Sequence, residues 1–213
     1  MTFLELTEGP LWYVALVVFS VGVAWNIIAI LAMRVRDDSA LPRKSPVGGG
    51  IKAIFLHMVP HGGFFTRTAY HVIVGYLFHF GLFALLLFGS FHIAFIEKWT
   101  GLSWTPMPRW GLVIAAEIAF GGLILMWIRR WTDPITRQIS DRDDHIGTGL
   151  TMLAMLTGCF AMAAASDFLR AFHMLSVELL MLYFPFSRLM HAFTFIFSRY
   201  FMGAAYGKRG YVP

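Results

Sequence analysis

Histidines are the residues of this sequence whose type and spacing most directly suggest chemistry. Five of the eight lie in two long apolar runs: His71, His79 and His92 in the first, and His173 and His191 in the second. An ionisable side chain inside a membrane span is energetically expensive, and by default it marks a functional site. A lone histidine is more often a hydrogen-bonded core residue, but this many on two runs favour ligands of a cofactor.

The spacing of these histidines predicts two sites at different depths. His173 and His191 are 18 residues apart, about five turns, so both would project from one face of a continuous helix, roughly 27 Å apart. The earlier run offers His79 and His92, about 20 Å apart. Because the two runs would cross in opposite directions, we expect His79 to meet His191 on the cytoplasmic side and His92 to meet His173 on the outer side.

Two histidines at each level suit an iron porphyrin. Two neutral imidazoles would fill both axial positions of the iron, which gives a low-spin centre suited to electron transfer. A structural zinc site would need about four ligands at one level, whereas these candidates divide between two depths. The pattern therefore predicts two b-type haems, an inner one on His79 and His191 and an outer one on His92 and His173.

The angular position of His92 is the weak point of this arrangement. Thirteen residues turn a helix by about 1300°, which leaves His79 and His92 roughly 140° apart around the axis. A tilt, a kink or supercoiling would have to absorb this angle. His71 is the reserve ligand, because it returns to within about 60° of the face that carries His92; otherwise it would have an interfacial role.

Five apolar runs are long enough to carry these histidines across roughly 30 Å of hydrocarbon. Hydrophobic residues make up 58% of the 213-residue chain and charged residues only 14%, which excludes an ordinary globular surface. We therefore expect an all-α, polytopic membrane bundle, a single transmembrane domain over 1–213. Its spans are predicted at about 11–33, 69–97, 110–128, 146–166 and 170–198.

Basic residues gather on alternate connections between the runs. Most follow the first, third and fifth runs, and on the other side there are only Lys98, Arg109 and Arg170. The positive-inside rule then predicts an outer N-terminus and a cytoplasmic C-terminus. The residues before the first run lack the features of a secretory signal, so this span is expected to remain. The net charge of +5 follows from the topology and requires no nucleic-acid partner.

The sequence limits which other electron carriers the chain can hold. Cys159 is its single cysteine, whereas an iron–sulfur cluster needs about four thiolates, so any cluster must belong to a partner. Two cytoplasmic connections, about 34–68 and 132–144, would receive a soluble subunit or serve as solvated connectors. His57 and His61, in the first of them, could bind a metal only if the intervening proline leaves them helical; otherwise they would lie at the interface or contact a partner.

Three segments resemble a known family. The stretch Phe184-Pro185-Phe186-Ser187-Arg188-Leu189-Met190-His191 closely resembles the last-helix motif of the gamma subunit of respiratory nitrate reductase, a five-helix cytochrome b. The match extends back to Leu169–His173, with the family's spacing between two haem histidines. The segment Leu77–Gly81 looks like the family's second-helix ligand motif.

This resemblance implies two b haems, a quinol site near the outer one, and iron–sulfur and catalytic subunits on the cytoplasmic side of a bacterial or archaeal cytoplasmic membrane. The chain departs from the family at the second histidine of the second helix, because Gly89 stands there and His92 follows about one turn later. Related cytochromes serve sulfite-reductase-linked and heterodisulfide-reductase-like membrane complexes, so the substrate of the complex stays open.

Further polar side chains could serve these sites. Arg188 would contact a haem propionate, assisted by Ser187, or reach the lipid headgroups. Glu178 lies about a turn and a half after His173, where an unpaired carboxylate is costly. It would carry protons for quinol chemistry or share a proton with a neighbour. Glu117, in the third run, raises the same question with less support.

Two functional hypotheses follow from these residues. The first is a di-haem cytochrome b membrane anchor that relays electrons between quinol or quinone and a cytoplasmic iron–sulfur oxidoreductase, with quinol oxidation or quinone reduction as its own chemistry. The second is a haem-free membrane anchor or transporter in which the histidines relay protons. A reduced-minus-oxidised spectrum distinguishes the two.

Overall fold

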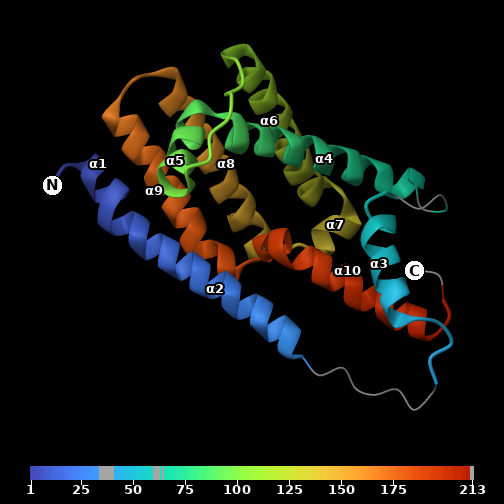
Figure 1. Ribbon diagram of the computed structural model, residues 1–213. Coiled ribbons are helices and arrows are strands. Elements are labelled where there is room, and N and C mark those ends of the chain that lie inside the picture. Colours follow the sequence, from blue (N-terminus) through green and yellow to red (C-terminus); the bar gives the residue numbers. More distant parts are fainter. Residues whose placement is uncertain (34–40, 60–62, 64, 212–213) are drawn as a thin grey trace. The chain divides into compact units, whose positions relative to one another are not determined.

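The computed structural model describes residues 1–33, 41–59, 63 and 65–211. Throughout these residues the regular structure is helical and no strand occurs, and five helices are long and apolar enough to cross a membrane. The prediction of an all-α, polytopic membrane protein is therefore confirmed. The chain divides into two compact units, Met1–Phe65 with Arg170–Pro213, and Thr66–Leu169; Figure 1 shows the helices of both.

The first unit begins with a long apolar stretch that forms α1 (Phe3–Leu6), the π-helical turn η1 (Thr7–Leu11) and α2 (Trp12–Ala32). A capping box starts α1, because the Thr2 hydroxyl accepts a hydrogen bond from the Glu5 amide while the Glu5 carboxylate accepts one from the Thr2 amide. The α2 helix contains no charged residue, which suits a membrane span.

The C-terminal part of this unit contains two helices where one was expected. The α9 helix (Asp167–Tyr183) and α10 (His191–Lys208) are joined by the 3-10 turns η3 (Phe184–Phe186) and η4 (Arg188–Met190). Pro185 has no amide hydrogen to continue the helix, and Ser187 is extended (φ −122°, ψ 169°). The prediction of one continuous helix over 170–198 is therefore wrong, as is the inference that His173 and His191 share a helix face.

The α2 helix runs beside α9 in the same direction. Near one end Glu8 forms an ion pair with Arg170. Near the other, the Asn26 amide donates a hydrogen bond to the Pro185 carbonyl at 3.1 Å, and a Cβ added at Gly22 would overlap the Pro185 ring. The break after α9 is thus held against α2 by a polar and a close-packed contact.

The short helix α3 (Pro46–Leu56) packs along α10 through small residues. A Cβ added at Gly49 would overlap the Gly203 carbonyl and lie 2.9 Å from Gly207 Cα. One added at Gly203 would overlap the side chain of Ala53. Small residues at such positions let two helix backbones approach closely, and Figure 1 shows α3 in cyan against the red end of α10.

The second unit is built on α4 (Phe65–Phe88), α6 (Arg109–Thr132) and α8 (Arg142–Ala163). A Cβ added at Gly122 would lie 2.8 Å from the Phe78 backbone nitrogen, so α4 and α6 meet at backbone distance there. Side chains of all three helices form the core of this unit, at Phe78, Ala119, Leu123 and Met155.

The apolar run expected as one span over 69–97 also consists of two helices. The α4 helix ends at Phe88, and α5 (Ser90–Thr100) begins after Gly89, which is extended (φ −68°, ψ 128°). The following loop supplies donors to the carbonyls at the break, because Trp104 Nε1 donates to Leu87 O at 2.7 Å and the Met107 amide donates to Phe88 O at 3.0 Å. Non-helical backbone at membrane depth needs such internal partners.

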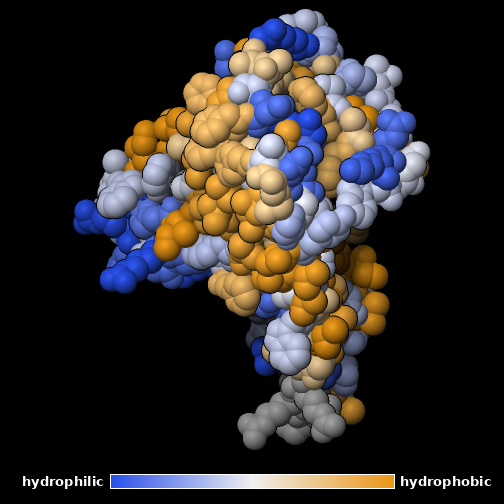
Figure 2. Space-filling model, turned by 90° about the vertical axis from the view of Figure 1, so that its left-hand side faces the viewer, coloured by the Kyte–Doolittle hydropathy of each residue, from blue (hydrophilic) through white to orange (hydrophobic). Residues whose placement is uncertain are grey.

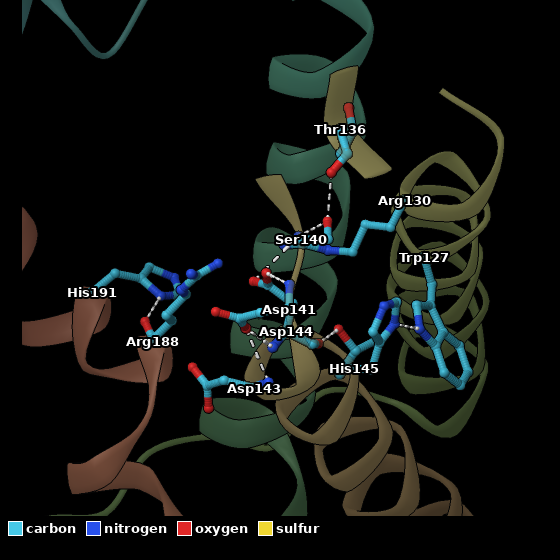
Figure 3. Close-up of polar contacts among 11 residues, drawn as sticks. Trp127, Arg130, Thr136, Ser140, Asp141, Asp143, Asp144, His145, Arg188 and His191 are labelled. Atoms are coloured by element: carbon cyan, nitrogen blue, oxygen red, sulfur yellow. Dashed lines mark hydrogen bonds and ion pairs between the residues drawn. The ribbon is translucent and has the colours of Figure 1, made fainter. Parts of the chain in front are cut away.

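The connection between α6 and α8 is ordered by its own polar side chains. It contains α7 (Pro134–Ile139), whose N-cap is Asp133. Hydrogen bonds from the Thr136 hydroxyl and amide lower the pKa of the Asp133 carboxyl below its ordinary value. Arg130 Nη1 lies 3.2 Å from Asp144 Oδ1 and donates to Ser140 Oγ at 3.0 Å (Figure 3). This segment is therefore a structured turn.

Hydrophobic side chains cover much of the face seen in Figure 2. Exposed hydrophobic side chains also occur on α2, where Trp25 is 73% exposed and Val21 is 63% exposed. Such exposure would be unfavourable in water over this area, and it agrees with a multi-pass membrane protein.

Candidate functional site

His79 lies in the middle of α4, in the second unit, and its ring is half-buried. Its Nδ1 is 2.7 Å from the carbonyl oxygen of Gly75, one turn earlier. The Phe78 ring packs edge-on against the imidazole, with 4.8 Å between ring centroids. The hydrogen bond to Gly75 and the contact with Phe78 both orient the ring, and the Phe83 ring lies 6.3 Å away between centroids.

His92 lies on α5, beyond the break at Gly89, and is half-buried. Its Nδ1 is 3.1 Å from the carbonyl oxygen of Leu85 on α4, so the imidazole bridges the break. A Cβ added at Gly89 would lie 3.3 Å from His92 Nδ1 and 2.9 Å from Leu85 O. The absence of a side chain at Gly89 is what lets the imidazole reach this carbonyl.

His191 is the first residue of α10, directly after the second break, and its side chain is exposed. Its Nδ1 is 2.7 Å from the carbonyl oxygen of Arg188, and Figure 3 shows the two side by side. The Ser187 hydroxyl donates to Phe184 O at 2.9 Å and accepts from the Leu189 amide at 3.2 Å, so it stabilises the turn before His191. Arg188 is exposed.

His173 and Glu178 lie on α9, in the first unit. His173 is half-buried, and its backbone carbonyl accepts a hydrogen bond from the Ser176 hydroxyl at 2.7 Å. Glu178 is only 2% exposed. Neither of its carboxylate oxygens has a hydrogen-bond partner among the residues that the structure describes. Of the two roles expected for Glu178, sharing a proton with a neighbour therefore finds no partner within this part of the chain.

The hydrogen bonds at Nδ1 fit the chemistry of a metal ligand. A carbonyl oxygen can only accept, so in the neutral imidazoles of His79, His92 and His191 the proton is on Nδ1 and the lone pair is on Nε2. Histidines that bind metals usually donate their other ring N–H in this way, which fixes the tautomer and makes the ligand more basic. The donor set present thus fits the axial positions of an iron porphyrin.

The remaining histidines differ in their surroundings. In His145 the tautomer is reversed, because Nδ1 accepts a hydrogen bond from Trp127 Nε1 at 3.1 Å (Figure 3). His57, at the end of α3, has its Nδ1 2.9 Å from Ala53 O, but its expected partner His61 and the intervening Pro60 lie outside the described residues. The reserve ligand His71 is exposed on α4.

The two predicted haem pairs each take one histidine from each unit. His79 and His92 belong to the second unit, whereas His173 and His191 belong to the first. Both pairings therefore stay predictions. Among the described residues no group of three or more histidine, cysteine, aspartate or glutamate side chains is placed to hold a metal ion.

A cavity of about 340 Å³ lies in the second unit between α6 and α8. Its walls are mostly apolar, and Glu117, Arg109 and Cys159 are among the residues that line it. Glu117 is exposed and Cys159 is half-buried. Neither lies on a helix that carries one of the four predicted haem ligands.

The sequence argument missed the two backbone breaks that position His92 and His191. Both have a local signal, since Gly89 interrupts an apolar run and Pro185 stands six residues before His191. Each break places a predicted ligand in the first turn of the helix that follows it. A break therefore lies between His79 and His92, whereas the pairing of His92 with His173 stays a prediction.

A comparison with known proteins finds similarity over nearly the whole chain. A protein of Nitratidesulfovibrio vulgaris (strain Hildenborough), described as "Protein", is 26% identical over 211 residues, which cover 95% of this chain and 93% of the relative. No family model matches the sequence. No solved structure matches it either.

Proposed function

We propose that this chain is a membrane cytochrome b subunit that holds two b-type haems. In this proposal His79 and His191 bind the inner haem, and His92 and His173 bind the outer one. The observation that carries the proposal is the set of Nδ1–carbonyl hydrogen bonds at three of these four residues. They hold Nε2 as the nitrogen with the lone pair.

The proposed activity is electron relay between the quinone pool and a cytoplasmic iron–sulfur oxidoreductase. A haem with two histidine ligands supplies one-electron transfer when bound, with no position left for oxygen. The chain's own residues hold and orient that centre, and the apolar helices around them keep bulk water away. Arg188, exposed beside His191, provides a guanidinium for a propionate by a charge-assisted bond.

On the outer side the chain would oxidise quinol or reduce quinone. Quinol oxidation releases protons as well as electrons, so a protonatable side chain within the membrane is useful there. Glu178 is the buried carboxyl on α9, about 7.5 Å along the helix from His173. It is our candidate for a proton carrier. The orientation of the chain and its location in a bacterial or archaeal cytoplasmic membrane are parts of the same proposal.

The test is the reduced-minus-oxidised spectrum of the protein purified with its partner subunits. We expect a b-type signal from two haems, and we expect His191→Ala to remove about half of it, because one of two bis-histidine sites is lost. His57→Ala is the matched control, since His57 has the same Nδ1–carbonyl bond but lies on α3.

Two results would contradict the proposal. A complex with stoichiometric subunits and no b-type absorbance would favour the haem-free anchor or transporter. An unchanged haem content in His191→Ala would show that this residue is not a ligand.

A further inference from the structure

The short helix α3 lies antiparallel to α10 in the first unit, and the two form a hairpin. A Cβ added at Gly203 would overlap the side chain of Ala53. One added at Gly207, about one turn later in α10, would lie 3.0 Å from the carbonyl oxygen of Ser45, which precedes α3. With 11 residues, α3 is about 16 Å long, which is too short to cross roughly 30 Å of hydrocarbon.

Four basic residues gather where α3 begins and α10 ends, and we call them the basic cluster. The Arg43 amide donates a hydrogen bond to the Lys208 carbonyl at 2.8 Å. The Arg43 side chain lies against Gly210, because a Cβ added there would be 3.3 Å from its carbons. Lys44 and Arg209 are the next residues along the chain, and both are exposed. None of the four forms an ion pair with a residue that the structure describes.

No acidic residue offsets these charges in the two segments that build the hairpin. Residues 41–59 and 191–211 contain neither aspartate nor glutamate. The connection between α6 and α8 differs, because aspartates stand among its arginines and Asp144 pairs with Arg130. An anionic surface is therefore the electrostatic complement of the hairpin. Its lysines and arginines are Arg43, Lys44, Lys52, Arg199, Lys208 and Arg209.

The face of α3 that points away from α10 is apolar. Val47, Ile51 and Phe55 are each 50% exposed or more. Steps of four residues advance a helix by about 40°, so these three side chains form one apolar stripe about 80° wide. Gly50 and Ala53, which are buried, lie about 100° and 160° around the axis from Ile51. The stripe is thus separate from the face that packs on α10.

We propose that the hairpin lies on the surface of an anionic membrane, with the apolar stripe among the lipid headgroups and the basic cluster at their phosphates. Helices with an apolar face and lysines or arginines beside it lie in the plane of the interface and favour anionic lipids. Clusters of about four to eight basic residues next to a span recognise such lipids. Lys52 is exposed, about 100° from Ile51, and its ammonium group can reach the headgroups while its methylenes stay beside the stripe.

Two further features favour a lipid surface over a soluble protein as the partner. Tyr206 and Tyr211 are exposed on either side of Lys208 and Arg209, and tyrosine is enriched where a membrane meets water. The hairpin also follows directly on α9, which is long and apolar enough to span a membrane, after only the short turns η3 and η4. A membrane surface is therefore the anionic surface closest to the hairpin along the chain.

The test measures the depth of position 55 in the full chain, purified and reconstituted in nanodiscs. Phe55→Cys carries a nitroxide, which is itself apolar, in a Cys159→Ala background, because Cys159 is the single cysteine. The discs contain phosphatidylcholine alone or mixed with phosphatidylglycerol. With phosphatidylglycerol, we expect the nitroxide to collide more with oxygen, which concentrates in lipid, than with a water-soluble nickel chelate. With phosphatidylcholine alone, or at high salt, we expect the reverse.

Lys44→Gln/Arg209→Gln removes two exposed charges of the basic cluster. Each lysine or arginine near an anionic surface favours the bound state about fivefold, so the ratio of lipid-facing to water-facing label should fall about 25-fold. Arg137→Gln/Arg142→Gln is the matched control, because it removes two exposed arginines from the connection between α6 and α8. This control should leave the depth of the label unchanged.

Three outcomes would overturn the proposal. A label that faces lipid equally in both membranes, or an equal loss in the two double variants, would show that the basic cluster does not recognise anionic lipid. A label that faces water in both membranes would exclude the membrane contact. If it then became shielded only in a complex with partner subunits, the surface would belong to a soluble protein. None of these measurements needs bound haem, so they test the hairpin independently of the function proposed above.

Discussion

Among single residues, the predicted haem ligands differ most in which backbone carbonyl their Nδ1 atom contacts. His79, His92 and His191 donate through Nδ1 to a backbone carbonyl, but the carbonyl comes from a different place in each case: one turn earlier, across a helix break, and from the turn just before. Only the first is a contact that any helical histidine can make with its own helix. The other two depend on local backbone that is unusual within an apolar run, so these two histidines are the more informative.

The arrangement at His92 predicts a specific effect of filling the space at Gly89. In Gly89→Val the added atoms would press on Leu85 O and His92 Nδ1, because a Cβ there already lies 2.9 and 3.3 Å from them. We expect loss of the outer-haem signal and retention of the inner one, measured by redox difference spectra. Gly121→Val on α6 is the control, since a Cβ there meets nothing within 4 Å.

If Gly89→Val retained a normal outer haem, the bond between His92 and Leu85 would have no part in positioning a ligand. His71 would then become the stronger candidate for the outer site. The residue types of the candidate site could be predicted from the sequence, because histidines in apolar runs are rare and costly. The hydrogen bonds that hold each imidazole ring could not be predicted, since each depends on the position of a single backbone carbonyl.

At the scale of the helices, hydropathy predicts the spans but not the breaks within them. Hydropathy over about 20 residues predicts where spans lie, because the cost of burying polar groups in hydrocarbon leaves few alternatives. It does not detect a break inside a span, because Gly89 and Pro185 hardly change the average. The 18-residue spacing of His173 and His191 therefore suggested a shared helix face, whereas α9 ends at Tyr183 and α10 begins at His191.

Packing of α3 on α10 predicts a sharp difference between two adjacent glycines. In Gly49→Ala the methyl group would overlap the Gly203 carbonyl, and we expect a loss of about 1–3 kcal/mol, the usual range for overpacking. In Gly48→Ala the methyl group meets only Ser45 at 3.7 Å, so the higher helix propensity of alanine should leave α3 unchanged or up to about 1 kcal/mol more stable.

Limited proteolysis of the purified protein checks this prediction, because α3 is exposed to cleavage once it leaves α10. Gly49→Ala should be cut faster near Pro46–Leu56 than the wild type, and Gly48→Ala should not. Equal protection of both variants would show that the close approach at Gly49 does not hold α3 on α10.

At the scale of the whole molecule, each predicted haem pair would take one histidine from each of the two units of the chain. The second unit is continuous from Thr66 to Leu169, and the first consists of the chain's two ends. Because each predicted pair has one histidine in each unit, cofactor binding would stabilise the association of the units as well as the site itself. Because the two histidines of each predicted pair belong to different units, the residue type of the ligands could be predicted from the sequence, but their pairing needs a separate test.

The pairing itself predicts which variants look alike. If both ligands are needed, His79→Ala and His191→Ala should each remove the same inner haem, and His92→Ala and His173→Ala should each remove the outer one, so that each variant keeps about half of the b haem. The double variant His79→Ala/His191→Ala should lose no more than either single variant, because residues that act as one unit are not additive. Haem content and redox titration of each purified complex measure this. If His71→Ala and His173→Ala lost the same haem while His92→Ala kept both, the outer ligand would be His71 instead of His92. If His79→Ala and His173→Ala lost the same haem, the partners in the two predicted pairs would be exchanged.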